Sequence, residues 1–274
     1  MRCLVVADLH YSLPQFDWLL AAAPQFDLVI FAGDALDISS IVDFRAQIVV
    51  VKKYLSLLAD RTRVILCSGN HDLDERNPDG EKIARWVADV RELGIATDGD
   101  NLAIGDTLFT VCPWWDGPLV KERLDAQLRD AAVNRPARWI WVHHAPPANS
   151  PTSWGGKRFF GDVELVQWIE RHQPSMVISG HVHQSPFIPD GSWFDRLGET
   201  WVFNTGRMPG RPPTYIVLDI DEGTAFWLAP GEEQTIDLNA SLQPAARIEN
   251  PPPWLTSLGL IADPTLARPA SAAG

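Results

Sequence analysis

Histidine and aspartate side chains recur in this sequence at the points where short apolar runs end. Of seven histidines, six follow or adjoin such an end: His10, His71, His143, His144, His181 and His183. Interleaved with them are Asp8, Asp34, Asn70 and Asp72. Imidazole, carboxylate and amide groups together suit borderline divalent ions such as Mn, Fe, Zn, Co or Ni rather than an all-oxygen calcium site. This number of candidate ligands is too large for a single ion and is better suited to two ions that share a bridging ligand.

The spacing of these residues favours a shared site. Asp8 and His10 are two residues apart, as are His181 and His183, so in extended backbone both side chains of a pair face the same side. Glycines precede Asp34, Asn70 and His181, and a residue without a Cβ lets other backbone approach closely.

The elements that must position these residues alternate along the chain. Apolar runs predict buried strands at 2–7, 27–33, 64–67, 138–142 and 176–179. Helical spacing predicts helices at 14–23, 41–59, 81–93, 120–133 and 162–172, the last with an acidic N-cap. Alternating strands and helices are typical of layered α/β architecture, in which ligands bind at the carboxyl ends of the strands.

The remaining segments predict a more antiparallel region and one long loop. Residues 101–112 are expected to form a hairpin, and strands are expected at 200–203, 214–220 and 223–228. Residues 145–161, rich in proline and glycine, are expected to form an exposed binding loop or lid. We expect one domain over residues 1–230, followed by a Pro/Ala-rich extension over residues 231–274 that wraps its surface or frays.

Composition narrows the class of protein. The 274 residues are 46% apolar, enough for a sizeable core. A formal charge of −12 disfavours a nucleic-acid-coating surface, so nucleic acid is an unlikely partner. The three cysteines are widely spaced within or beside apolar runs and look like reduced core thiols. The first apolar run is too short for a signal sequence or a membrane span, so a cytoplasmic enzyme is expected.

The polar residues form an ordered series of motifs. They are Asp8-x-His10, Gly33-Asp34-x-x-Asp37, Gly69-Asn70-His71-Asp72, His143 and Gly180-His181-x-His183. This series resembles that of the calcineurin-like metallophosphoesterases, and it spans residues 8–183, about two-thirds of the chain. The resemblance implies a four-layer α-β-β-α sandwich of two packed mixed sheets, with a binuclear metal site at the strand carboxyl ends.

The resemblance also implies roles for individual residues. One ion would be held by Asp8, His10, Asp34 and His183, and the second by Asp34, Asn70, His143 and His181, with Asp34 as the bridge. His143 is preferred to His144 because the family's ligand directly ends its strand. His144 is then either a substrate contact or a residue that hydrogen-bonds the loop.

In the mechanism that the resemblance implies, a hydroxide bridging the two metals attacks phosphorus. His71 would protonate the leaving group, and Asp37 would raise the pKa of His71 and keep it protonated. For Asp72, capping a turn and a functional role remain equally open.

Two departures from the resemblance disfavour particular subfamilies. Protein Ser/Thr phosphatases carry an arginine where this chain has Ile38, and purple acid phosphatases carry a tyrosine ligand where it has Asp37. A phosphate clamp must then come from elsewhere, and the candidates are Lys157, Arg158 and Arg207. Aromatic loop residues either rim the cleft and stack on a substrate or simply pack the loops: Trp114, Trp115, Trp154, Phe159 and Phe160.

The function expected from these observations is metal-dependent phosphoester hydrolysis. The segment from His143 to Pro147 is similar to one in small-molecule phosphodiesterases, so the expected substrate is a phosphodiester or monoester of a small organic molecule or nucleotide. A nuclease of the same superfamily is an alternative that the negative charge disfavours. A non-catalytic scaffold is another, but such proteins tend to lose ligands and this chain lacks none of them.

Overall fold

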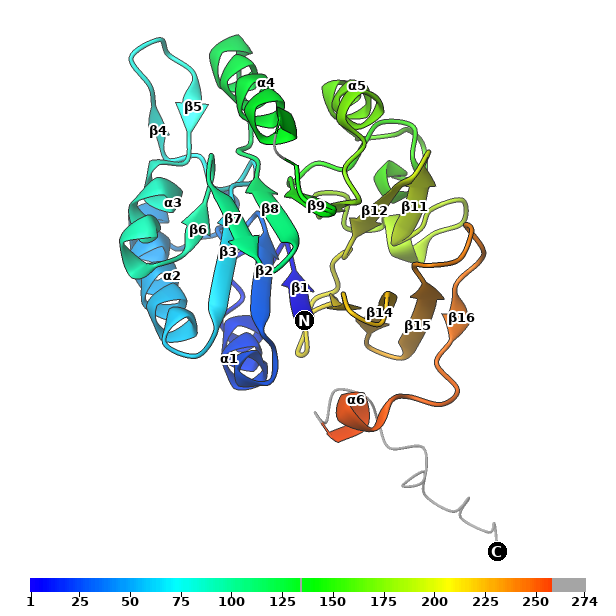
Figure 1. Cartoon of the computed structure of the whole chain (residues 1–274). Coiled ribbons are helices and arrows are strands. Elements are labelled where there is room, and N and C mark those ends of the chain that lie inside the picture. Colours follow the sequence, from blue (N-terminus) through cyan, green and yellow to red (C-terminus); the bar gives the residue numbers. More distant parts are fainter. Residues whose placement is uncertain (134, 258–274) are drawn as a thin grey trace, which may run out of the picture.

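Two mixed β-sheets packed face to face form the centre of this computed structural model, which describes residues 1–133 and 135–257 (Figure 1). In the first sheet the order is β16-β15-β14-β13-β1-β2-β3-β6. Its parallel half comprises β1 (Arg2–Val6), β2 (Leu28–Ala32), β3 (Arg63–Cys67) and β6 (Ala96–Thr97). Its antiparallel half comprises β13 (Tyr215–Asp219), β14 (Thr224–Ala229), β15 (Glu232–Asp237) and β16 (Ala246–Arg247).

The second sheet has a parallel centre and antiparallel edges, in the order β11-β12-β10-β9-β8-β7. Its central strands are β8 (Thr107–Val111), β9 (Arg138–Val142), β10 (Met176–Ser179) and β12 (Thr200–Asn204). The edges are β7 (Asn101–Ile104) and β11 (Phe194–Leu197). A small separate hairpin joins β4 (Glu75–Arg76) to β5 (Lys82–Ile83).

Helices cover the outer face of each sheet. Those on the first sheet are α1 (Leu13–Ala22) and α2 (Phe44–Ala59), and those on the second are α4 (Pro118–Val133) and α5 (Val163–His172), which lie along the top of Figure 1. Two short helices are α3 (Arg85–Asp89) and α6 (Pro253–Ser257). Three apolar clusters fill the spaces between these layers, the middle one between the sheets. The expected four-layer α-β-β-α architecture is therefore confirmed.

Two local expectations were wrong. The helix expected at 81–93 begins only at Arg85, because Lys82 and Ile83 pair with β4 and the Glu81 carboxylate accepts hydrogen bonds from backbone N–H groups at the start of α4. The loop at 145–161 is not exposed throughout. Residues 151–153 form a buried 3₁₀ turn, and Ser150 caps it by accepting from the N–H of Thr152.

The segment after residue 230 continues the first sheet. β15 pairs with β14 along its whole length, so the boundary expected at residue 230 falls inside a β-hairpin. Farther along, Leu255 is fully buried in the cluster beneath α1 and α2, and Trp254 packs on Phe226. Residues 258–274, which complete the expected extension, lie outside the described residues. Within the part of the chain that the structure describes, no helix has the length and apolar character needed to span a bilayer.

Candidate metal centre

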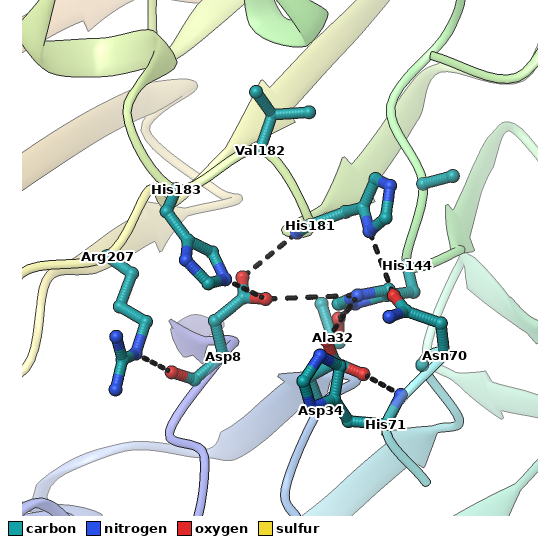
Figure 2. A network of polar contacts seen from close by, with 12 residues as sticks. Asp8, Ala32, Asp34, Asn70, His71, His144, His181, Val182, His183 and Arg207 are labelled. Carbon is teal, nitrogen blue, oxygen red and sulfur yellow. Dashed lines mark hydrogen bonds and ion pairs between the residues drawn. The ribbon is translucent and has the colours of Figure 1, made fainter. Parts of the chain in front are cut away.

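The carboxyl ends of neighbouring parallel strands from both sheets meet at one edge of the sandwich. In the first sheet, β1 leads to Asp8 and His10, β2 to Asp34, and β3 to Asn70 and His71. In the second sheet, β9 leads to His143 and His144, β10 to His181 and His183, and β12 to Arg207. Residues that are up to about 200 positions apart in sequence therefore converge, as Figure 2 shows.

Two buried carboxylates lie at the centre of this cluster. Asp8 is fully buried and Asp34 is 1% exposed. His183 Nε2 lies 3.2 Å from Asp8 Oδ1, and His144 Nε2 lies 3.1 Å from Asp34 Oδ2 (Figure 2). His10 Nε2 lies 3.6 Å and 3.8 Å from carboxylate oxygens of Asp8 and Asp34 respectively, and so adjoins both.

Four residues of the cluster adopt a left-handed backbone conformation, which residues other than glycine rarely take. The φ angle is +56° at Asp8, +44° at His10, +55° at Asp34 and +71° at His181. Left-handed conformations at non-glycine residues cost about 1–3 kcal/mol each and gather at functional sites. Four of them around two carboxylates mark this edge as built for binding rather than for stability.

The glycines that precede three of the polar residues make this convergence sterically possible. A Cβ at Gly33 would lie 2.4 Å from His144 Nδ1, and one at Gly69 would lie 2.1 Å from Asp34 Oδ1. A Cβ at Gly180 would lie 2.4 Å from Asp8 Oδ2. Each glycine thus makes room for a polar side chain from a different strand, which is the close approach expected from the sequence.

The charges at the centre are strongly coupled. Burial alone would raise the pKa of the Asp8 carboxyl, but hydrogen bonds from His10 and His183 hold it well below its ordinary value. Burial would lower the pKa of His144, but the Asp34 carboxylate beside it raises that pKa to about 10. Burial and the charge of His144 lower the pKa of His181 to about 4. The two carboxylates thus need positive charge nearby.

His144, not His143, is the histidine from β9 that contacts the buried carboxylates. The His144 Nδ1–H group faces the Ala32 carbonyl oxygen at 2.7 Å, which orients Nε2 toward Asp34. That Nε2 is buried and has no hydrogen-bond partner among the described residues. His143 instead places Nε2 3.2 Å from Asp162 Oδ2, on the side of the second sheet that faces α5. The structure therefore separates the two histidines that the sequence placed at one strand end.

Asn70 and His181 lie beside the carboxylates. Asn70 Oδ1 is 2.9 Å from His181 Nδ1, and the backbone N–H of His181 donates to Asp8 Oδ2 at 3.0 Å. The rings of His144 and His181 have their centroids 5.2 Å apart. Asn70 and His181 thus lie together with His144 on one side of the cluster.

His71 and Asp37 lie at the rim of the cluster. His71 Nδ1 is 3.6 Å from Asp37 Oδ1 and accepts a hydrogen bond of 3.3 Å from the N–H of Ile38, so Nε2 carries the proton of the neutral ring. Burial lowers the pKa of His71, and the carboxylates of Asp34 and Asp37 offset this only in part. Asp37 thus raises the pKa of His71, as expected, but burial outweighs it.

Asp72 caps a turn, and it also joins two loops of the centre. Its carboxylate is fully buried and accepts hydrogen bonds from the N–H groups of Gly69, Asp34 and Leu36 at 2.8–3.1 Å. Burial and the nearby Asp34 charge raise its pKa to about 7. Asp72 thus holds the loop after β2 against the loop after β3.

The basic residues considered as a phosphate clamp differ in position. Arg207 lies at the cluster and donates from Nε to the Asp8 carbonyl oxygen at 2.8 Å (Figure 2). Arg158 is exposed, with its guanidinium carbon 4.6 Å from the centre of the Phe160 ring. Lys157 is exposed in the same loop. Only Arg207 of the three contacts a residue of the centre in the described chain.

This donor set fits divalent metal ions. Donor atoms of Asp8, His10 and His183 all lie within 4.8 Å of one another, and so do those of Asp8, Asp34 and His144. Buried carboxylates and imidazole nitrogens that converge in this way are the ligands preferred by Mn, Fe, Zn and related ions. A third group of the same compactness comprises His10, Asp34 and His71. The groups share Asp8, His10 and Asp34, so the two carboxylates and His10 link them.

Comparison with known proteins agrees with this geometry. The family model described as calcineurin-like phosphoesterase matches residues 1–185. No curated protein sequence matches the chain. Among solved structures, the protein TT1561 of Thermus thermophilus is 15% identical with a TM-score of 0.55, covering 86% of this chain and 98% of its own.

Two further solved structures share the fold. A dimetal phosphatase from Danio rerio is 10% identical with a TM-score of 0.52, over 87% of this chain and 99% of its own. The purple acid phosphatase PPD1 from yellow lupin seeds is 12% identical with a TM-score of 0.54, over 89% of this chain and 52% of its own. At such identities the likeness concerns the fold alone.

Proposed function

The chain belongs to the calcineurin-like phosphoesterase family, and from this premise we propose that it is a metal-dependent phosphohydrolase with two ions at the edge described above. The proposed substrate is a phosphodiester or phosphomonoester of a small organic molecule. The observation that carries the proposal is the pair of buried carboxylates, Asp8 and Asp34, surrounded by imidazoles from both sheets. A site of this kind without a cation would leave negative charge buried at considerable cost.

The geometry supports a specific division of ligands. One ion would be held by Asp8, His10, Asp34 and His183, and the second by Asp34, Asn70, His144 and His181. His144 replaces His143 in the second set because its Nε2 lies 3.1 Å from Asp34, whereas His143 pairs with Asp162. When bound, the ions would supply positive charge for the phosphate oxygens and lower the pKa of an attacking water.

The surrounding residues have positioning and proton-transfer roles in this proposal. Arg207 holds the Asp8 main chain, and Asp72 holds the loops that carry Asp34 and Asn70. As an imidazolium paired with Asp37 through Nδ1, His71 would donate its Nε2 proton to the leaving oxygen and become neutral. The His71 side chain is more exposed than the Asp8 and Asp34 carboxylates beside it, which leaves its ring accessible to a substrate atom.

The test is metal-dependent turnover. Chelated protein should be inactive, and added Mn(II) should restore hydrolysis of bis-p-nitrophenyl phosphate or p-nitrophenyl phosphate. Asp34→Asn should abolish this recovery. The matched control is Asp190→Asn, because Asp190 has a similar φ of +65° but lies in an exposed loop. If metal-loaded protein hydrolyses neither ester, the proposal fails and a non-catalytic role for the same fold is favoured.

A further inference from the structure

A pocket with aromatic walls adjoins the metal centre. It has a volume of about 250 Å³, and its lining includes Trp114, Trp115, Phe160, His143 and His181. His181 is shared with the metal centre. The Trp114 ring lines the pocket, and its centroid lies 5.3 Å from that of His181 and 5.7 Å from that of His144, so the pocket opens beside residues of the metal centre. A group attached to a phosphate at the centre would therefore enter this pocket.

The polar wall of the pocket is fixed by one carboxylate. Asp162 Oδ2 accepts from the indole N–H of Trp115 at 3.0 Å and lies 3.2 Å from His143 Nε2, while Oδ1 accepts from the N–H of Leu165 at the start of α5. Asp162 is thereby satisfied by groups of the protein itself. Trp115 and His143 both face Asp162, although His143 Nδ1 has no partner among the described residues. Aromatic rings thus make up much of the surface offered to a ligand.

Phe160 is held in place although its side chain is partly exposed. Its N–H donates to the Ser153 carbonyl oxygen at 2.8 Å, and the Arg158 guanidinium lies over its ring. A Cβ at Gly155 would lie 2.3 Å from the ring, so this glycine provides the space that the ring occupies. Phe160 remains 40% exposed. A preorganised aromatic side chain that is left exposed beside a reactive centre is suited to covering a bound ligand.

The charge at the pocket opposes a second anionic group. Besides Asp162, Glu164 lines the pocket, and its carboxylate is paired with Lys121 at 2.9 Å. Both carboxylates are paired within the protein, and the Arg158 guanidinium lies over the Phe160 ring outside the pocket lining. The volume lies below the roughly 300–1,000 Å³ of pockets for drug-sized ligands, and so suits one small ring system.

We propose that this pocket binds a flat, uncharged aromatic group, so that the preferred substrates are aryl or heteroaryl phosphoesters. This inference rests on the proposed function, because it assumes that phosphate binds at the adjoining metal centre. Stacking and edge-to-face contacts with Trp114, Trp115 and Phe160 would favour a flat ring over a saturated ring of equal size. An alkyl group would lose these contacts altogether.

The experiment compares three phosphonates, which bind like esters but contain no ester bond to hydrolyse. Phenylphosphonate, cyclohexylphosphonate and methylphosphonate are titrated into Mn(II)-loaded protein by calorimetry. Phenylphosphonate should bind about tenfold more tightly than methylphosphonate, with cyclohexylphosphonate between them. Phe160→Ala should remove most of the phenyl preference. Phe159→Ala is the matched control, since Phe159 is similarly exposed but packs on Trp154 and does not line the pocket.

Each outcome has a distinct meaning. Equal affinity for the phenyl and methyl compounds, or equal effects of the two phenylalanine variants, overturns the pocket assignment. Cyclohexyl binding as tight as phenyl binding overturns the aromatic class. If the phenyl preference is found but bis-p-nitrophenyl phosphate is not hydrolysed, the pocket stands and the proposed function fails. If bis-p-nitrophenyl phosphate is hydrolysed but no phenyl preference is found, the proposed function stands and the pocket assignment fails.

Discussion

The two adjacent histidines at the end of β9 face opposite sides of their sheet. Ile140 and Val142 point into the core between the sheets, whereas Trp139 and Trp141 point toward α4 and α5. The same alternation carries His144 to the inner side, where the carboxylates lie, and turns His143 outward to Asp162. One position along the strand thus separates a candidate metal ligand from a residue of the neighbouring pocket.

His144→Gln and His143→Gln therefore form a matched pair. Loss of a residue that only supports a metal ligand typically lowers metal affinity or activity about 10–100-fold. Loss of His144, a proposed ligand itself, should therefore lower metal affinity about 100-fold or more. His143→Gln should retain the metal content of the unaltered protein. Metal content after dialysis, measured by atomic emission, tests this directly. Equal metal loss in both variants, or a larger loss in His143→Gln, contradicts the assignment.

His71→Ala should leave metal content unchanged, because this side chain lies at the rim and donates a proton rather than binding an ion. The rate for phenyl phosphate, whose leaving group needs a proton, should fall about 100-fold or more. The rate for p-nitrophenyl phosphate should fall much less, because its leaving group is a weaker base. Steady-state kinetics with both esters provide the measurement, and equal slowing of the two rules out His71 as the general acid.

For individual residues, the sequence predicts which side chains lie together at the metal centre, but it predicts the role of each one less well. The glycines before Asp34, Asn70 and His181 mark close approach in the sequence itself. Strand alternation counted from Ile140 and Val142 could also have distinguished His144 from His143. The lowered pKa of His71 could not be predicted, because it depends on burial by residues from several strands.

Among the elements, α5 supports the aromatic pocket through its N-cap, Asp162. Asp162 accepts from the Leu165 N–H group and also contacts Trp115 and His143. Asp43 caps α2 in the usual way, accepting from the N–H groups of Arg45 and Ala46. Both carboxylates cap a helix N-terminus, but only Asp162 also contacts residues that line the pocket.

Asp162→Ala and Asp43→Ala should each lower the free energy of unfolding by about 1 kcal/mol, the usual value of such a cap. Only Asp162→Ala should also weaken the preference for phenylphosphonate over methylphosphonate, because Trp115 and His143 lose their common partner. Urea denaturation and calorimetry measure the two effects. An unchanged preference in Asp162→Ala would show that this carboxylate does not position the pocket.

Strands formed by continuous apolar runs were predictable, and those defined by pairing alone were not. The strand expected at 138–142 has the bounds observed for β9. β15 carries a single buried residue, Ile236, among polar ones, so its strand character depends on pairing with β14. The 81–93 segment has helical spacing, yet its first residues join the β4–β5 hairpin because β4 offers them a partner.

At the scale of the whole molecule, the chain after β16 completes the core beneath α1 and α2. Leu255 is fully buried there, and the Arg2 guanidinium lies 4.3 Å from the centre of the Trp254 ring. The segment thus closes over the sheet that carries Asp8 and Asp34, on the face away from the second sheet. In Figure 1, α6 lies at the opposite end of the molecule from α4 and α5.

Leu255→Ala should therefore lower the free energy of unfolding by about 2 kcal/mol or more, as expected for a buried leucine. Leu242→Ala is the control, because Leu242 is 48% exposed, and it should change stability by less than about 0.5 kcal/mol. Urea denaturation of both variants gives the comparison. Equal stability of the two variants would mean that this terminal segment contributes little to the fold in solution.

The position of β1 affects how the protein is made. β1 is the first strand of the chain, yet it lies in the interior of its sheet, between β2 and β13. During synthesis its edge stays unpaired until residues 215–219 have left the ribosome. Asp8 and Asp34 are then present for most of translation without the histidines of the second sheet. Completion of the proposed metal site is consequently a late event in biogenesis, and the β1 edge is closed later still.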